Sequence, residues 1–107
     1  MSVDFSKLKT AEQKAEDAAK QAHEQWKRGR AAAVEAIRVT TAAGNTFDGD
    51  EESQGRMARA VLGLESVPNS TVTWVLADNS KIQATSAELR EALALAGAEQ
   101  ARLWVKA

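Results

Sequence analysis

The sequence of 107 residues contains no cysteine, a single histidine, a single proline and no tyrosine. Without cysteine the chain can form no disulfide, thiolate metal site or thiol nucleophile. His23 alone cannot build a multi-histidine metal centre, and its charged, alanine-rich surroundings are typical of an exposed helix face. No Gly-rich phosphate loop or nucleophile motif is present. We therefore expect a non-enzymatic protein with no catalytic residue, no metal and no cofactor.

Two further absences limit the partners. The 14 basic and 15 acidic residues leave a net charge of −1, which argues against electrostatic binding to nucleic acid or to an anionic membrane. No apolar run approaches the roughly 20 residues that span a bilayer, and the first residues have no signal-peptide core. These features predict a cytoplasmic protein with no membrane contact.

Bulky hydrophobic residues are scarce in the first part of the chain. Residues 6–36 have helix-forming composition, but the apolar seam that repeats at helical spacing is almost all alanine. Such a seam buries little area per turn, so it cannot dock strongly on a core. We predict a helical arm over residues 1–25, which frays, projects or pairs with another helix, and an α+β domain over residues 26–107 anchored by Trp26. The seam consists of Leu8, Ala11, Ala15, Ala18 and Ala22.

Residues 37–48 alternate in polarity and predict a short hairpin around Gly44, with continuation of the helix through Val39 as the alternative. Asp50 then predicts the N-cap of an amphipathic helix. Its apolar stripe consists of Met57, Ala60, Val61 and Leu64. The acidic run over residues 48–52 fits this helix start better than a calcium loop, because its glycine stands at the wrong position.

Residues 71–84 predict a second hairpin, with Asp78 and Asn79 as a two-residue turn. Thr85 and Glu88 then have the spacing of a capping box, which predicts a final helix ending near Trp104. Its apolar face consists of Leu89, Ala92, Leu93, Ala96 and Leu103.

These elements predict an α+β fold: a long N-terminal helix, two short hairpins joined into one small antiparallel sheet, and middle and C-terminal helices packed on that sheet. The contact between sheet and helices would bury apolar residues of both. These are Val72, Trp74 and Ile82 on the strands and Met57, Val61 and Leu93 on the helices.

Two segments carry a resemblance to a known family. The segments are Phe47–Met57, which reads FDGDEESQGRM, and Thr73–Asn79, which reads TWVLADN. Over residues 28–104 the chain resembles the bacteriophage and prophage family named domain of unknown function 4376, whereas residues 1–27 show no feature of it. The resemblance implies a structural or assembly role associated with tail fibres, in the host cytoplasm or the virion, and it implies no catalytic residues.

Four residues are candidates for a contact surface. Ser53, Gln54 and Arg56 stand in the resembling segment without an obvious structural reason, and Trp104 either closes the core or docks a partner. The expected partners are tail or assembly proteins, with self-association through the N-terminal helix. The alternative is a small prophage regulator that binds nucleic acid through Arg56 and Arg59, which lie one helical turn apart.

Overall fold

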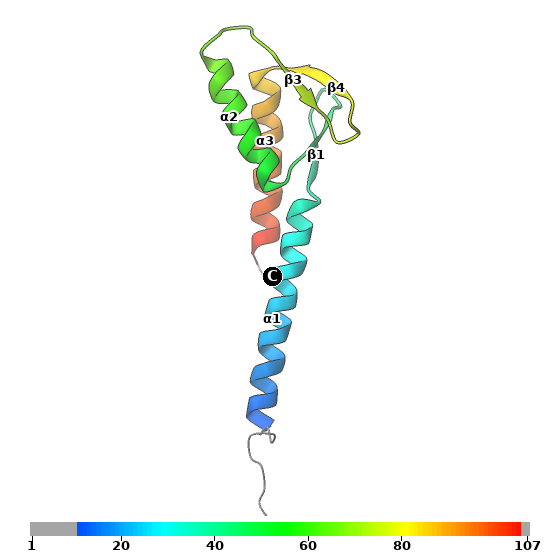
Figure 1. Ribbon diagram of the computed structural model, residues 1–107, viewed down its shortest axis with the longest axis vertical. Helices are drawn as coiled ribbons and strands as arrows, with labels where there is room; N and C mark the ends of the chain where they lie inside the picture. The colour runs from blue at the N-terminus through cyan, green and yellow to red at the C-terminus, as the bar shows by residue number, and fades with distance from the viewer. Residues whose placement is uncertain (1–10, 106–107) are drawn as a thin grey trace, which may run out of the picture. The chain divides into compact units, whose positions relative to one another are not determined.

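The computed structural model describes residues 11–105, within which it contains three helices and four strands (Figure 1). The α+β fold class is confirmed, and helix does not continue through Val39. The chain divides into two units, Met1–Ala31 and Ala32–Ala107. We call residues 32–105 the head. In chain order the elements are α1 (Ala11–Glu35), β1 (Arg38–Thr40), β2 (Thr46–Asp48), α2 (Glu51–Glu65), β3 (Val72–Val75), β4 (Lys81–Ala84) and α3 (Ser86–Trp104).

The two hairpins form separate two-stranded sheets, β1–β2 and β3–β4, which corrects the expectation of one joined sheet. A backbone bond links them, in which the Ala77 N–H donates to the Thr46 carbonyl at 3.0 Å. The shortness of β1 and β2 limits further pairing between the sheets, because each of these strands has three residues. A two-stranded ribbon is marginal alone in water, so each hairpin needs the helices beside it.

Both hairpins use the same three-residue turn. In the first turn, the Gly44 N–H donates to the Thr41 carbonyl at 2.9 Å, and the backbone of Gly44 has a φ of +89°. In the second turn, the Asn79 N–H donates to the Leu76 carbonyl at 2.9 Å, and the backbone of Asn79 has a φ of 67°. The second turn therefore has three residues and not the predicted two, and its last residue adopts the left-handed conformation that glycine and asparagine tolerate.

The head repeats one ββα unit. The same number of positions separates the turn residues Gly44 and Asn79, the helix N-caps Asp50 and Thr85, and two buried helix residues, Met57 of α2 and Ala92 of α3. The large side chain on α2 thus corresponds to a small one on α3. This pairing of sizes allows the two helices to approach each other closely.

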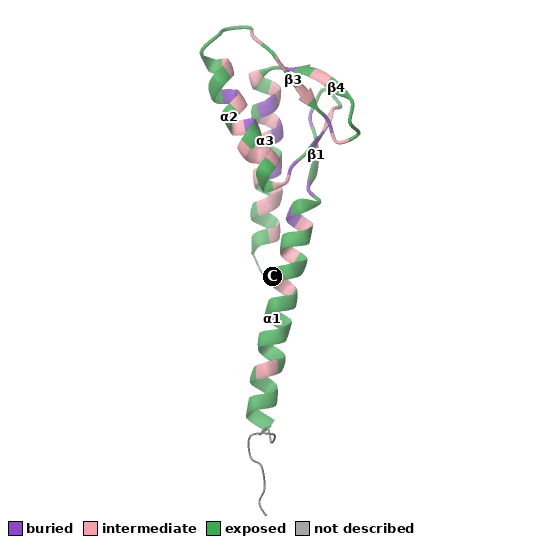
Figure 2. Ribbon diagram, in the orientation of Figure 1, coloured by how far each residue is buried: buried purple, intermediate pink, exposed green. Residues whose placement is uncertain are grey.

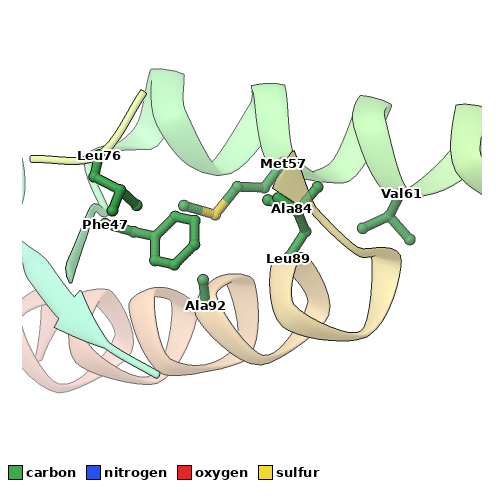
Figure 3. Packing of buried hydrophobic residues seen from close by; sticks show 7 residues of the cluster. All are labelled: Phe47, Met57, Val61, Leu76, Ala84, Leu89 and Ala92. Carbon is green, nitrogen blue, oxygen red and sulfur yellow. The ribbon is translucent and has the colours of Figure 1, made fainter. Parts of the chain in front are cut away.

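The main core lies between α2, α3 and the strands. Phe47, Met57 and Leu89 are fully buried, and Figure 3 shows the first two side by side between the helices. The predicted contact between strands and helices is confirmed, since all six of its residues belong to this cluster or pack against it. They are Val72, Trp74, Ile82, Met57, Val61 and Leu93.

A second cluster joins the end of α1 to α3. Val34, Ile37 and Ala96 are buried together, with Val39 and Leu103 packed against them. Gly49 lies at the same place, and its N–H donates to the Ile37 carbonyl at 2.8 Å.

The first turn of α3 also holds the β1–β2 turn. The Glu88 carboxylate accepts from the Thr41 hydroxyl at 2.9 Å and from the Asn45 amide at 2.8 Å. The Thr85 hydroxyl caps α3 by accepting from the Glu88 N–H at 3.2 Å, as predicted. The Glu88 side chain, which a capping box would direct back to Thr85, is instead used for this tertiary contact.

Most residues of α1 before Ala31 are exposed (Figure 2). Ala15, Ala18 and Ala22 are exposed, while Leu8 lies outside the described residues. Trp26, which was expected to anchor this helix, is half-buried. It stacks on His23 at 5.7 Å, and the Arg30 guanidinium lies 4.7 Å from the ring centroid.

We predict that Gly49→Ala lowers the free energy of unfolding by about 1–3 kcal/mol. A Cβ at this position would lie 2.6 Å from the Ile37 Cγ2 and 3.0 Å from the Ala96 Cβ, so the packed cluster would have to shift. The matched control is Gly63→Ala in α2, where a Cβ meets nothing within 4 Å and removal of glycine adds about 0.5–1 kcal/mol. Urea unfolding measures both changes, and equal effects at the two positions would contradict this packing.

Candidate functional site

The candidate site is a groove of about 310 Å³ beside β3, which we call the edge groove. β3 and its following turn form one wall, and the start of α2 and the end of β2 form the other. The lining residues are Asp48, Ser53, Arg56, Thr73, Trp74, Val75, Leu76 and Asn79.

Ser53 and Arg56, two of the four predicted contact residues, line this groove together. They lie three positions apart on α2 and therefore on the same helix face. The Arg56 Nη2 donates to the Glu52 Oε1 at 2.7 Å, and both side chains are well exposed. Asp48 supplies the opposite charge in the groove, and it lies 3.6 Å from the Arg38 Nε across the first hairpin.

Gln54 faces away from the groove and joins α2 to α3. Its Nε2 donates to the Gly49 carbonyl at 2.9 Å and to the Gln100 Oε1 at 2.7 Å. The Gln100 amide in turn donates to the Glu51 Oε1 at 2.7 Å. Gln54 therefore has a structural role in the tertiary fold that the sequence did not reveal.

Trp104 lies in the last turn of α3 and is 47% exposed. It is not among the residues that line the edge groove. The four predicted contact residues therefore do not form one site, since only Ser53 and Arg56 are brought together.

The contribution of β3 to this groove was not predicted from the sequence. Trp74 was expected to fill the core, and it does pack against the main cluster, but it is half-buried and also lines the groove. Its neighbours Thr73 and Val75 are exposed. The available signal was the run of four uncharged strand residues, Val72–Val75.

Hydrogen bonds also act on the carboxyl group of Asp78, which lies in the turn of the second hairpin. The Ser80 hydroxyl donates to the Asp78 Oδ1 at 2.6 Å, and the Ser80 N–H donates to the same oxygen at 2.9 Å. These two bonds, the hydroxyl first, lower the pKa of the Asp78 carboxyl below its usual range. A hollow of about 380 Å³ beside this turn is lined by Arg38, Asn45 and Asp78 among others.

Within residues 11–105, no three of the histidine, aspartate and glutamate side chains are grouped so that they could hold a metal ion. No helix in that range is both long enough and apolar enough to cross a membrane. The edge groove itself brings polar side chains together beside strand β3 and the Trp74 ring.

The family model of a domain of unknown function, number 4376, matches residues 9–106 of the chain. The chain belongs to this family. The match includes the whole of α1, so the expectation that the resemblance begins at residue 28 was wrong. No curated protein and no solved structure matches the chain.

We predict that Gln54→Ala lowers the free energy of unfolding by about 1–2 kcal/mol, because two part-buried hydrogen bonds are lost. Arg56→Ala is the matched control on the same helix. It should cost at most about 0.5 kcal/mol, because its ion pair with Glu52 is exposed. Thermal and urea unfolding check this order, and a larger loss for Arg56→Ala would contradict the assigned roles.

We also predict that Ser80→Ala raises the pKa of Asp78 toward its usual value, since the hydroxyl hydrogen bond, the largest cause of the lowering, is removed. Because this pKa is lowered in the folded chain, the associated stability is present at neutral pH and is lost as the pH falls below about 4. Carboxyl carbon NMR titration measures the change. Glu99, whose pKa is lowered by its hydrogen bond from Arg102, is the internal control and should not move.

Proposed function

We propose that this chain is a non-enzymatic interaction module associated with the tail or tail fibre of a phage or prophage. Membership of the family supports the proposal through the phage association that the resemblance implies. The proposed partners are tail or assembly proteins, and the proposed location is the cytoplasm of the bacterial host or the virion.

The observation that carries the proposal is the exposure of α1. Between Ala11 and Ala31, every residue except Asp17, Trp26 and Arg30 is exposed. A helix gains most of its stability in proteins by packing an apolar face. We therefore propose that this segment pairs with α1 of a second copy through its alanine seam, and that the paired helices serve as a tether for the heads.

The head contributes a preformed docking surface in this proposal. The walls of the edge groove belong to elements that the main core holds together, since Trp74 packs against the same cluster that contains Met57. Binding to such a surface needs little reordering of the head, which reduces the entropic cost of association.

The alternative function, nucleic-acid binding, draws on Arg56 and Arg59 of α2. The Arg56 guanidinium already donates to Glu52 on the same helix, and the chain has a net charge of −1. No observation on the head favours this alternative over protein binding. A low-salt titration with duplex and single-stranded DNA tests it, and salt-sensitive binding tighter than about 100 μM would support it.

We predict that the full chain self-associates and that Ala18→Glu, which places a charge in the seam, shifts it to the monomer. Ala31→Glu is the control, because it adds the same charge on the opposite face of the helix, at a position that is also exposed. Sedimentation velocity and light scattering give the mass of each. A monomeric full chain, or equal dissociation by both variants, would remove the pairing from the proposal.

The tail association has its own test. Genes for tail-fibre or baseplate proteins on either side of this gene would support it. Neighbouring replication or repressor genes would contradict it and favour the regulator.

A further inference from the structure

The side of β3 that faces away from β4 is an unpaired strand edge. Hydrogen-bonded pairs alternate along an antiparallel ladder. The Leu76 N–H donates to the Ser80 carbonyl at 2.8 Å, so the next bonded residue of β3 is Trp74. The N–H and C=O groups of Thr73 and Val75 therefore point away from β4, toward the side where both residues line the edge groove.

This edge lacks the protection that the other strands carry. Charged residues on edge strands oppose pairing with a foreign strand. β1 contains Arg38, β2 contains Asp48 and β4 contains Lys81, whereas Val72–Val75 of β3 has no charge. It contains instead four residues of the β-branched and aromatic types that favour strand pairing.

The groove has room and chemistry for an added strand. Its opposite wall supplies the Ser53 hydroxyl, the Arg56 guanidinium and the Asp48 carboxylate, which is paired with Arg38 of the first hairpin. Arg56 is engaged by an exposed contact with Glu52 of its own helix, a weak interaction that an incoming carboxylate can replace. The exposed side chain of Val75, at 50% exposure, offers an apolar contact on the outer face of β3.

We propose that the edge groove binds an extended segment of a partner protein, which pairs through its backbone with Thr73 and Val75 and directs an acidic side chain to Arg56. The bound segment becomes the third strand of the β3–β4 sheet. This inference deepens the proposed function and rests on it, since it names the kind of partner that the head receives.

The test uses short peptides selected from a displayed library of random sequences against the full chain. The selected peptides should be extended and enriched in aspartate and glutamate. On binding, NMR should show slowed exchange of the Thr73 and Val75 amide protons, which point into the groove, and little change at Trp74, whose N–H is already bonded within the hairpin.

The Val75→Pro variant tests the role of the β3 edge. It removes an N–H group that points away from β4, and it removes no hydrogen bond between β3 and β4. It should weaken peptide binding by about tenfold or more. Lys81→Pro is the matched control, because Lys81 stands opposite Val75 and its N–H points to the other edge of the same hairpin. Arg56→Glu should reverse the charge preference of the selected peptides.

Three results would overturn the inference: no peptide recovered, peptides that leave the Thr73 and Val75 amides unprotected, or equal weakening by the two proline variants. The amide measurement decides the matter on the unaltered chain if Val75→Pro fails to fold. Peptides that bind elsewhere on the head would contradict the strand pairing, but they would still agree with the proposed interaction module. Self-association and gene neighbours test that module independently.

Discussion

The close approach of α3 to its neighbours is the constraint on which the head depends. Its buried face combines Leu89 with Ala92 and Ala96, all with no exposed surface. Small side chains let the facing elements come near, and the space is then filled by Phe47 and Met57 from the other side. Hydrogen bonds that Gln100 accepts from Gln54, and that Glu88 accepts from Thr41 and Asn45, fix the orientation of this apolar contact toward the two ends of the helix. The helix thus holds α2 and both hairpins in one unit.

This arrangement explains why the hairpins remain separate sheets. Each is stabilised by the helices and needs no third strand to persist. The single bond from Ala77 to Thr46 brings the sheets together at one end only. The backbone groups of Thr73 and Val75 are therefore left available beside a wall formed by α2. An open edge of this kind follows from packing hairpins on helices, and its lack of charge distinguishes β3 from the other strands.

The elements of the fold could be predicted because the spacing of apolar residues in the sequence reflects which side chains are buried. The alternation that places Val72, Trp74 and Leu76 on one face reappears in their burial, and the stripe from Met57 to Leu64 packs as a helix face should. Turn length could not be predicted, since Asn79 suits both two-residue and three-residue loops. The hydrogen bond between Gln54 and Gln100 could not be predicted because the two residues are 46 positions apart, and local sequence carries no record of such a contact. The repeated ββα unit was not visible in the sequence for a related reason. Corresponding residues such as Met57 and Ala92 differ in size, because both pack into the same core, where a large side chain on one helix is matched by a small one on the other.

The same reasoning separates the residues of α2 by what they contribute. Gln54 and Met57 face α3 and the core, where their partners are fixed. Ser53 and Arg56 face the groove, and the contact of Arg56 is with its own helix. A residue whose partner lies on its own helix can exchange that partner without disturbing the fold, whereas a residue that joins two elements cannot. The groove-facing side of α2 can therefore change without loss of the fold, while the opposite side must preserve the contact with α3.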